Sequence, residues 1–114
     1  MKFEIDNDIW HIEIKDKQTM LNKLNEDRPE EDRYTYAFGV CMYPKHEIWI
    51  NEDACKEQQI RTLRHELTHC FLWYSGCYNA PSYTEEMVCD IVANSYNFIN
   101  EIVDKFKEEQ NSIK

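Results

Sequence analysis

The segment from Ile60 to Tyr74 constrains the fold more than any other part of the chain. Its apolar residues recur at spacings of three and four, at Ile60, Leu63, Leu67, Phe71 and Tyr74. This spacing predicts an amphipathic helix whose apolar stripe packs against another element, such as a sheet. Ser75-Gly76 follows the stripe, and glycine suits the left-handed conformation that commonly ends a helix.

The same segment contains His65-Glu66-Leu67-Thr68-His69, which has the form H-E-x-x-H. Positions i and i+4 share one face of a helix, so His65 and His69 are placed to hold one zinc ion. Both histidines lie off the apolar stripe, on an adjoining face that can border a cleft. Glu66 points roughly 100 degrees away around the helix axis. It is the candidate general base, which takes a proton from a zinc-bound water and passes it to the leaving amine.

A catalytic zinc ion usually has three protein ligands, so one more is needed. Ser82 and Glu85 match the capping-box pattern S-x-x-E and predict a second helix that runs to about Phe106. Glu86, in its first turn, is the candidate third ligand, with Glu85 as the alternative. Asp90, four residues after Glu86, is the candidate to accept a hydrogen bond from the ring N–H of a ligand histidine. The expected buried face of this helix comprises Val88, Ile91, Val92, Ser95, Phe98, Ile99, Ile102 and Phe106.

A second electrophile normally stabilises the oxyanion that forms during peptide hydrolysis. Tyr83 is the candidate for this role, and the open alternatives are Tyr74, Tyr78, His11 and His46. Simpler explanations exist for the same residues. A His-Glu-His cluster can lie on a solvated helix face, and acidic residues are common in a first helical turn because the helix dipole favours them.

The remainder of the chain predicts strands and one short helix. Alternating apolar residues indicate a strand at 9–14, and an amphipathic helix follows over 16–26, with Asp16 as its N-cap. Residues 34–42 and 46–51 are expected to form a hairpin. The predicted fold is α+β, in a single domain of residues 1–114. A small, mainly antiparallel sheet from residues 9–14, 34–42 and 46–51 packs on the H-E-x-x-H helix, and the C-terminal helix closes the site.

Composition excludes several classes of function. The net charge of −9, from 22 acidic and 13 basic residues, opposes direct binding to nucleic-acid phosphate. No apolar run approaches the roughly 18 residues of a membrane span. The charged, alternating N-terminus is unlike a signal peptide. Five cysteines without a C-x-x-C pair favour reduced thiols, Cys70 and Cys77 included, although both could act as soft metal ligands. A cytoplasmic location is therefore expected.

His65-Glu66-Leu67-Thr68-His69 together with Glu86-Met87-Val88-Cys89-Asp90 resembles the H-E-x-x-H plus E-x-x-x-D pattern of the gluzincin metallopeptidases. Over roughly residues 34–100 the order of elements is similar to the ImmA/IrrE family of small bacterial and phage endopeptidases. The resemblance implies a zinc-dependent endopeptidase with Glu66 as base, His65, His69 and Glu86 as ligands, and Asp90 behind a histidine. Members of that family often cleave a transcriptional repressor, which makes a protein or peptide the expected substrate. A SprT-like or other minimal zincin is the neighbouring alternative.

Three functional hypotheses follow from the sequence. The first is a zinc endopeptidase that acts on a cytoplasmic protein, and it depends on Glu66, because a structural zinc site needs no base. The second is a non-catalytic, zinc-stabilised binding module of phage or prophage origin that retains the zincin fold. The third is a metal-free interaction protein.

Overall fold

The computed structural model describes residues 1–77 and 80–112 of the chain. Within these residues it contains a four-stranded sheet, three α-helices and a short 3-10 turn. In chain order they are β1 (Lys2–Ile5), β2 (Asp8–Lys15), α1 (Lys17–Leu24), the 3-10 turn (Glu30–Asp32), β3 (Gly39–Met42), β4 (Glu47–Asn51), α2 (Lys56–Ser75) and α3 (Glu85–Ser112). The α+β class that the sequence predicts is therefore confirmed.

The sheet is mixed, whereas the sequence predicts a mainly antiparallel one. Its strand order is β1-β2-β4-β3. Strands β1 and β2 pair antiparallel, as do β3 and β4, but the central pair of β2 and β4 is parallel. The connection from β2 to β4 passes through α1 and the hairpin strand β3, which allows the two central strands to run in the same direction.

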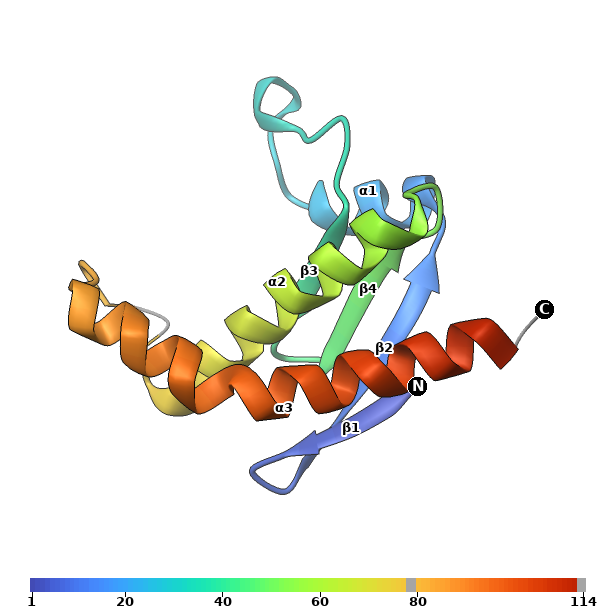
Figure 1. The fold of residues 1–114 in the computed structure, drawn as a ribbon. Helices are drawn as coiled ribbons and strands as arrows, with labels where there is room; N and C mark the ends of the chain where they lie inside the picture. The colour runs from blue at the N-terminus through green and yellow to red at the C-terminus, as the bar shows by residue number, and fades with distance from the viewer. Residues whose placement is uncertain (78–79, 113–114) are drawn as a thin grey trace.

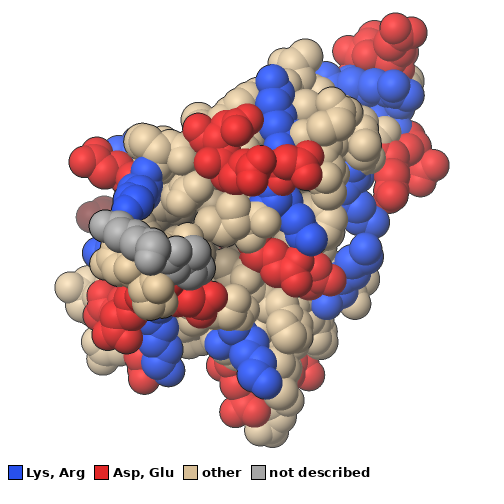
Figure 2. Space-filling view, turned by 90° about the vertical axis from the view of Figure 1, so that its right-hand side faces the viewer, with Lys and Arg blue, Asp and Glu red and all other residues tan. Residues whose placement is uncertain are grey.

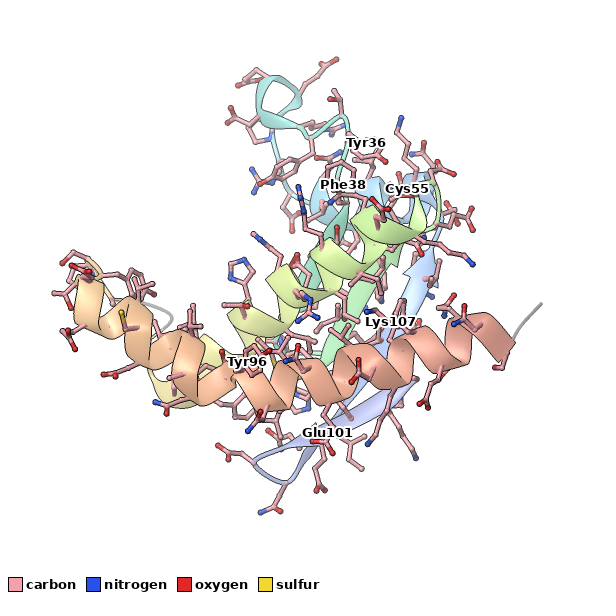
Figure 3. The ribbon with its side chains drawn as sticks, in the orientation of Figure 1. Tyr36, Phe38, Cys55, Tyr96, Glu101 and Lys107 are labelled. Atoms are coloured by element: carbon pink, nitrogen blue, oxygen red, sulfur yellow. The ribbon has the colours of Figure 1, made fainter. Side chains whose placement is uncertain are left out.

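Strand β1 is additional to the three strands that the sequence predicts. It pairs with β2 across a tight turn in which Asp6 and Asn7 adopt φ values of 49° and 68°. Asparagine and aspartate tolerate this left-handed conformation better than most residues. The predicted strand over 34–42 is wrong in its first half, because β3 begins only at Gly39. Tyr34, Tyr36 and Phe38 precede β3 as large exposed side chains. Figure 3 labels Tyr36 and Phe38.

The molecule has three layers, with α2 and α3 on one face of the sheet and α1 on the other (Figure 1). Strand β4 shows the reason, because successive side chains of a strand point to opposite faces. Ile48 and Ile50 join the main core with residues of α2 and α3. Trp49, between them, packs with Met20 of α1 and Met42 of β3.

Helix α1 begins where the sequence predicts, since the Asp16 carboxylate accepts the N–H of Thr19 at 2.8 Å.

Helix α2 is fixed to the sheet at both of its ends. Near its start, the Gln59 side chain donates to the Asn51 carbonyl at 3.1 Å. Near its end, the Trp10 indole donates to the Tyr74 hydroxyl at 2.9 Å. That hydroxyl in turn donates to the Asp8 carboxylate at 2.6 Å. The helix ends at Gly76 with φ of 81°, which confirms the predicted left-handed cap. The position of the H-E-x-x-H segment against the sheet is thereby set.

Helix α3 is buried along only part of its length. Ser95, Ile99, Ile102 and Phe106 are buried as predicted, and Val103 joins them with no exposed surface. The same prediction is wrong for Val88 and Val92, which are 49% and 57% exposed. The N-terminal part of α3 extends past the end of α2 (Figure 1). Both valines are largely open to solvent.

The start of α3 differs from the predicted capping box. The hydroxyl of Thr84 accepts the N–H of Met87 at 3.1 Å, and the Thr84 carbonyl accepts the N–H of Val88. Thr84 therefore caps the helix, two residues after the predicted Ser82, and Glu85 lies within the helix.

The helices, the surface charges and the cysteines of the structure bear on the expectations from composition. No helix among the described residues combines the length and apolarity that crossing a membrane requires. Acidic and basic side chains are interspersed over the face shown in Figure 2. All five cysteines are free thiols.

Candidate metal centre

His65 and His69 present their rings side by side on the exposed surface of α2. Their Nε2 atoms lie 3.2 Å apart, and the ring planes are nearly perpendicular, at 76°. Two nitrogens bound to one tetrahedral zinc ion at about 2.0–2.1 Å would be separated by about 3.3 Å. The side chains therefore already have the separation that a shared zinc ion requires. Ligand atoms of His65, Glu66 and His69 all lie within 4.8 Å of one another.

Glu66 differs from the two histidines because it is turned toward the sheet and is only 6% exposed. Gly39 of the edge strand β3 makes room for it. A Cβ atom at Gly39 would lie 3.4 Å from Cγ of Glu66 and 2.5 Å from Cγ2 of Thr62. A larger residue at this position of β3 would clash with Thr62 of α2 and with the Trp49 carbonyl of β4. Gly39 thus allows β3 to approach α2 closely beside Glu66.

Burial also changes the acid–base properties of this carboxyl group. Removal from water disfavours the charged form and raises the pKa of Glu66 to about 7. A general base works best when its pKa is near the pH at which it operates. In the metal-free protein, Glu66 is therefore poised to exchange a proton near neutral pH.

Burial acts in the opposite direction on the neighbouring histidine. It lowers the pKa of His69, and the proximity of His65 lowers it further. Both effects favour the neutral imidazole, which is the form that binds metal. His69 therefore favours the neutral, metal-binding form already in the metal-free site.

The predicted third ligand, Glu86, is exposed in the first turn of α3, as is Glu85, and Asp90 is exposed one turn later. Among the described residues, the group that could hold a metal consists of His65, Glu66 and His69 and does not extend to these carboxylates. The structure therefore brings two predicted ligands and the base together, while Glu86 and Asp90 lie on the uncovered part of α3.

Three of the five residues predicted as candidates to stabilise the oxyanion already have other partners. The Tyr83 hydroxyl donates to the Cys77 carbonyl at 2.6 Å, so it would have to leave that partner to reach a substrate. The Tyr74 hydroxyl is held by Asp8. His46 stacks on the Trp10 ring at 5.1 Å between centroids. His11 is an exposed residue of β2, and Tyr78 lies outside the described residues.

Tyr43 contacts the metal-site helix although the sequence analysis places it in a turn. Its hydroxyl donates to the His69 carbonyl at 3.3 Å, and its ring stacks on Trp73 at 4.4 Å. Burial raises the pKa of Tyr43 well above its ordinary value, so the hydroxyl keeps its proton at neutral pH. No local pattern signals this contact, because it joins residues 26 positions apart.

Two thiols near the site, Cys70 and Cys41, lie outside the group of described residues that could hold a metal. Cys70 is fully buried, and burial raises the pKa of its thiol to about 12. Burial also raises the pKa of Cys41. Cys70 packs in the core and Cys41 packs against it, both as small apolar residues.

Comparisons with family models, with curated proteins and with solved structures find no match to this chain. Its function must therefore be inferred from its own residues.

Proposed function

We propose that this protein is a zinc-dependent endopeptidase that hydrolyses peptide bonds of a protein substrate. The observation that carries the proposal is the combination at one site of two histidines 3.2 Å apart and a buried carboxyl group with a pKa of about 7. A structural metal site would not need a titratable base beside its ligands. The sequence resemblance to gluzincins, and to the ImmA/IrrE family in particular, supports the same class.

Each residue has a distinct role in this proposal. His65 and His69 hold the metal, which when bound would polarise the scissile carbonyl and acidify a water molecule. Glu66 accepts a proton from the attacking water and delivers it to the leaving amine. Burial of Glu66 supports this role, because it raises the pKa of the carboxyl group to about 7, close to neutral pH. Tyr83 stays the proposed oxyanion donor and would exchange its bond to Cys77 for one to substrate.

The third ligand is proposed to be Glu86, with Asp90 behind a ligand histidine. Both residues lie in the part of α3 whose apolar side chains are uncovered, so this part makes few contacts that would resist a shift toward α2. Metal analysis of Glu86→Ala tests the assignment, with Glu85→Ala as the matched control in the same helical turn. Loss of zinc affinity in Glu86→Ala alone supports it, and full zinc retention in Glu86→Ala overturns it.

Turnover is tested by incubating the zinc-loaded chain with a mixed peptide library and identifying the cleaved bonds by mass spectrometry. Glu66→Gln should retain zinc but lower the cleavage rate by roughly 10²-fold or more. Glu57→Gln, in the exposed first turn of α2, is the matched control and should cleave normally. Cleavage that persists in Glu66→Gln contradicts the mechanism. Zinc binding without any cleavage would instead identify a non-catalytic, zinc-stabilised module.

A further inference from the structure

A small cavity lies between α2 and α3, directly beside the metal centre. Its volume is about 200 Å³. It is lined by Arg64, Thr68, Ile91, Val92, Tyr96 and Ile99. Two of these residues immediately precede the metal-site histidines, because Arg64 adjoins His65 and Thr68 adjoins His69. Figure 3 places Tyr96 on the stretch of α3 that passes α2. A peptide lying across the two histidines would therefore reach the cavity.

The cavity wall is mainly apolar, and the hydroxyl groups of Thr68 and of Ser95, which also lines it, are already satisfied. Thr68 donates to the Arg64 carbonyl at 2.7 Å, and Ser95 donates to the Ile91 carbonyl at 2.6 Å. Both bonds run back along their own helices, which leaves methyl and methylene groups toward the cavity. Ligand sites for drug-sized molecules are usually larger, at 300–1,000 Å³. The size and lining fit one aliphatic or aromatic side chain.

Arg64 adds a charge at the edge of this apolar cavity. Its Nη1 donates to the Asn100 side chain at 2.7 Å, which holds the guanidinium between the two helices. Among the residues that the structure describes, Arg64 forms no ion pair. A guanidinium without a carboxylate partner, in a chain with a net charge of −9, is a local site for an acidic group.

We propose that this cavity is a substrate subsite, which takes an apolar side chain while Arg64 binds the carboxylate of an adjacent acidic residue. This proposal rests on the proposed peptidase function, because that function places the cavity beside the peptide bond that is cleaved. It names the substrate class as a peptide with an apolar residue next to aspartate or glutamate. Val92, 57% exposed, and Tyr96, 62% exposed, would be covered when such a peptide binds.

The test uses the metal-free full chain, whose fold is first verified by NMR, so that neither zinc nor turnover is needed. The probe is acetyl-leucyl-glutamate amide, and its binding is followed by backbone chemical shifts. Shifts at Thr68, Ser95 and Tyr96 are expected. The glycyl-glutamate analogue should bind roughly tenfold more weakly, because it lacks the apolar side chain. The leucyl-glutamine analogue should bind roughly fivefold more weakly, because it lacks the charge.

Matched variants separate the subsite from general effects. Arg64→Gln should weaken probe binding roughly fivefold, whereas Arg61→Gln, which removes an equal charge one turn earlier, should change it less than twofold. Val92→Asp should abolish binding, and Val88→Asp, at an exposed position outside the cavity lining, should not. Both valines are exposed, so neither change should unfold the chain.

Several results would overturn the subsite. The first is chemical-shift changes confined to residues outside the cavity. The second is binding of the glycyl-glutamate analogue as tight as that of the leucyl-glutamate probe. The third is tighter binding of acetyl-leucine, whose only charge is its terminal carboxylate. Probe binding without peptide cleavage would contradict the proposed peptidase function and leave the subsite in place. Cleavage without preference for an apolar residue beside an acidic one would contradict the subsite alone.

Discussion

Both halves of α3 carry apolar side chains, but in opposite surroundings. In the C-terminal half, Ile102, Val103 and Phe106 are at most 5% exposed and belong to the main core with the sheet and α2. In the N-terminal half, Val88 and Val92 are about half exposed. The difference shows that an apolar stripe indicates which face of a helix is available for burial, but not what covers it. The covered half stabilises the fold, and the uncovered half carries the proposed ligand and part of the proposed subsite.

The largest expected effect comes from making the same substitution in both halves. Val103→Ala removes two methyl groups from a fully buried position and should lower the free energy of unfolding by about 2–3 kcal/mol. Val92→Ala should lower it by less than about 0.5 kcal/mol, because the side chain is exposed. Urea denaturation measures both values. Equal losses would mean that α3 is packed along its whole length, which would remove the contrast.

Helix α2 shows a related contrast between buried Glu66 and exposed His65 and His69. The pKa of Glu66 is raised from 4.5 in the unfolded chain to about 7 in the folded one, so the folded state binds more protons between these values. Stability of the metal-free protein should fall as pH rises from 4.5 to 7, by about 3 kcal/mol from this group.

Glu66→Gln should remove this pH dependence. The variant should be about 2–3 kcal/mol more stable than the metal-free wild type above pH 8, and the difference should vanish below pH 4.5. Thermal or urea unfolding across this pH range measures it. Glu57→Gln, at an exposed position of the same helix, provides the control. A pH profile that Glu66→Gln leaves unchanged would show that Glu66 titrates as an ordinary surface carboxyl group.

The smallest expected effect concerns the cap of α3. Thr84→Ala removes the acceptor for the Met87 N–H and should cost about 0.5–1 kcal/mol of local helix stability. Amide hydrogen exchange should accelerate in the uncovered N-terminal half but stay unchanged from Ile99 onward. Acceleration along the entire helix would show that its two halves open as one unit.

Local signals in the sequence predict much of this fold. The spacing of apolar residues identifies α2, Asp16 marks the start of α1, and Gly76 marks the end of α2. These features depend on residues within a few positions of one another. The pairing of β2 with β4 depends on distant partners, which the sequence pattern does not specify. The extra strand β1 pairs locally with β2 across the Asp6-Asn7 turn, a signal that the prediction did not use.

The candidate site divides in the same way. The i, i+4 spacing predicts the close approach of His65 and His69, because a single helix determines it. Glu66 is buried beside Gly39 of the edge strand, and the Tyr43 contact comes from the hairpin turn. Both depend on how the sheet meets α2. Glu86, the proposed third ligand, lies in the solvent-exposed N-terminal part of α3. Its coordination of the metal therefore stays a prediction.

The zinc content of the purified chain tests the central claim most directly. Inductively coupled plasma mass spectrometry should find one zinc ion per wild-type chain after dialysis against a weak chelator. His65→Ala and His69→Ala should each contain essentially none, because either change leaves one imidazole at the site. His11→Ala, which alters an exposed histidine of β2, should keep its zinc. Retention of zinc in both His65→Ala and His69→Ala, or its absence from the wild type, would contradict the metal centre.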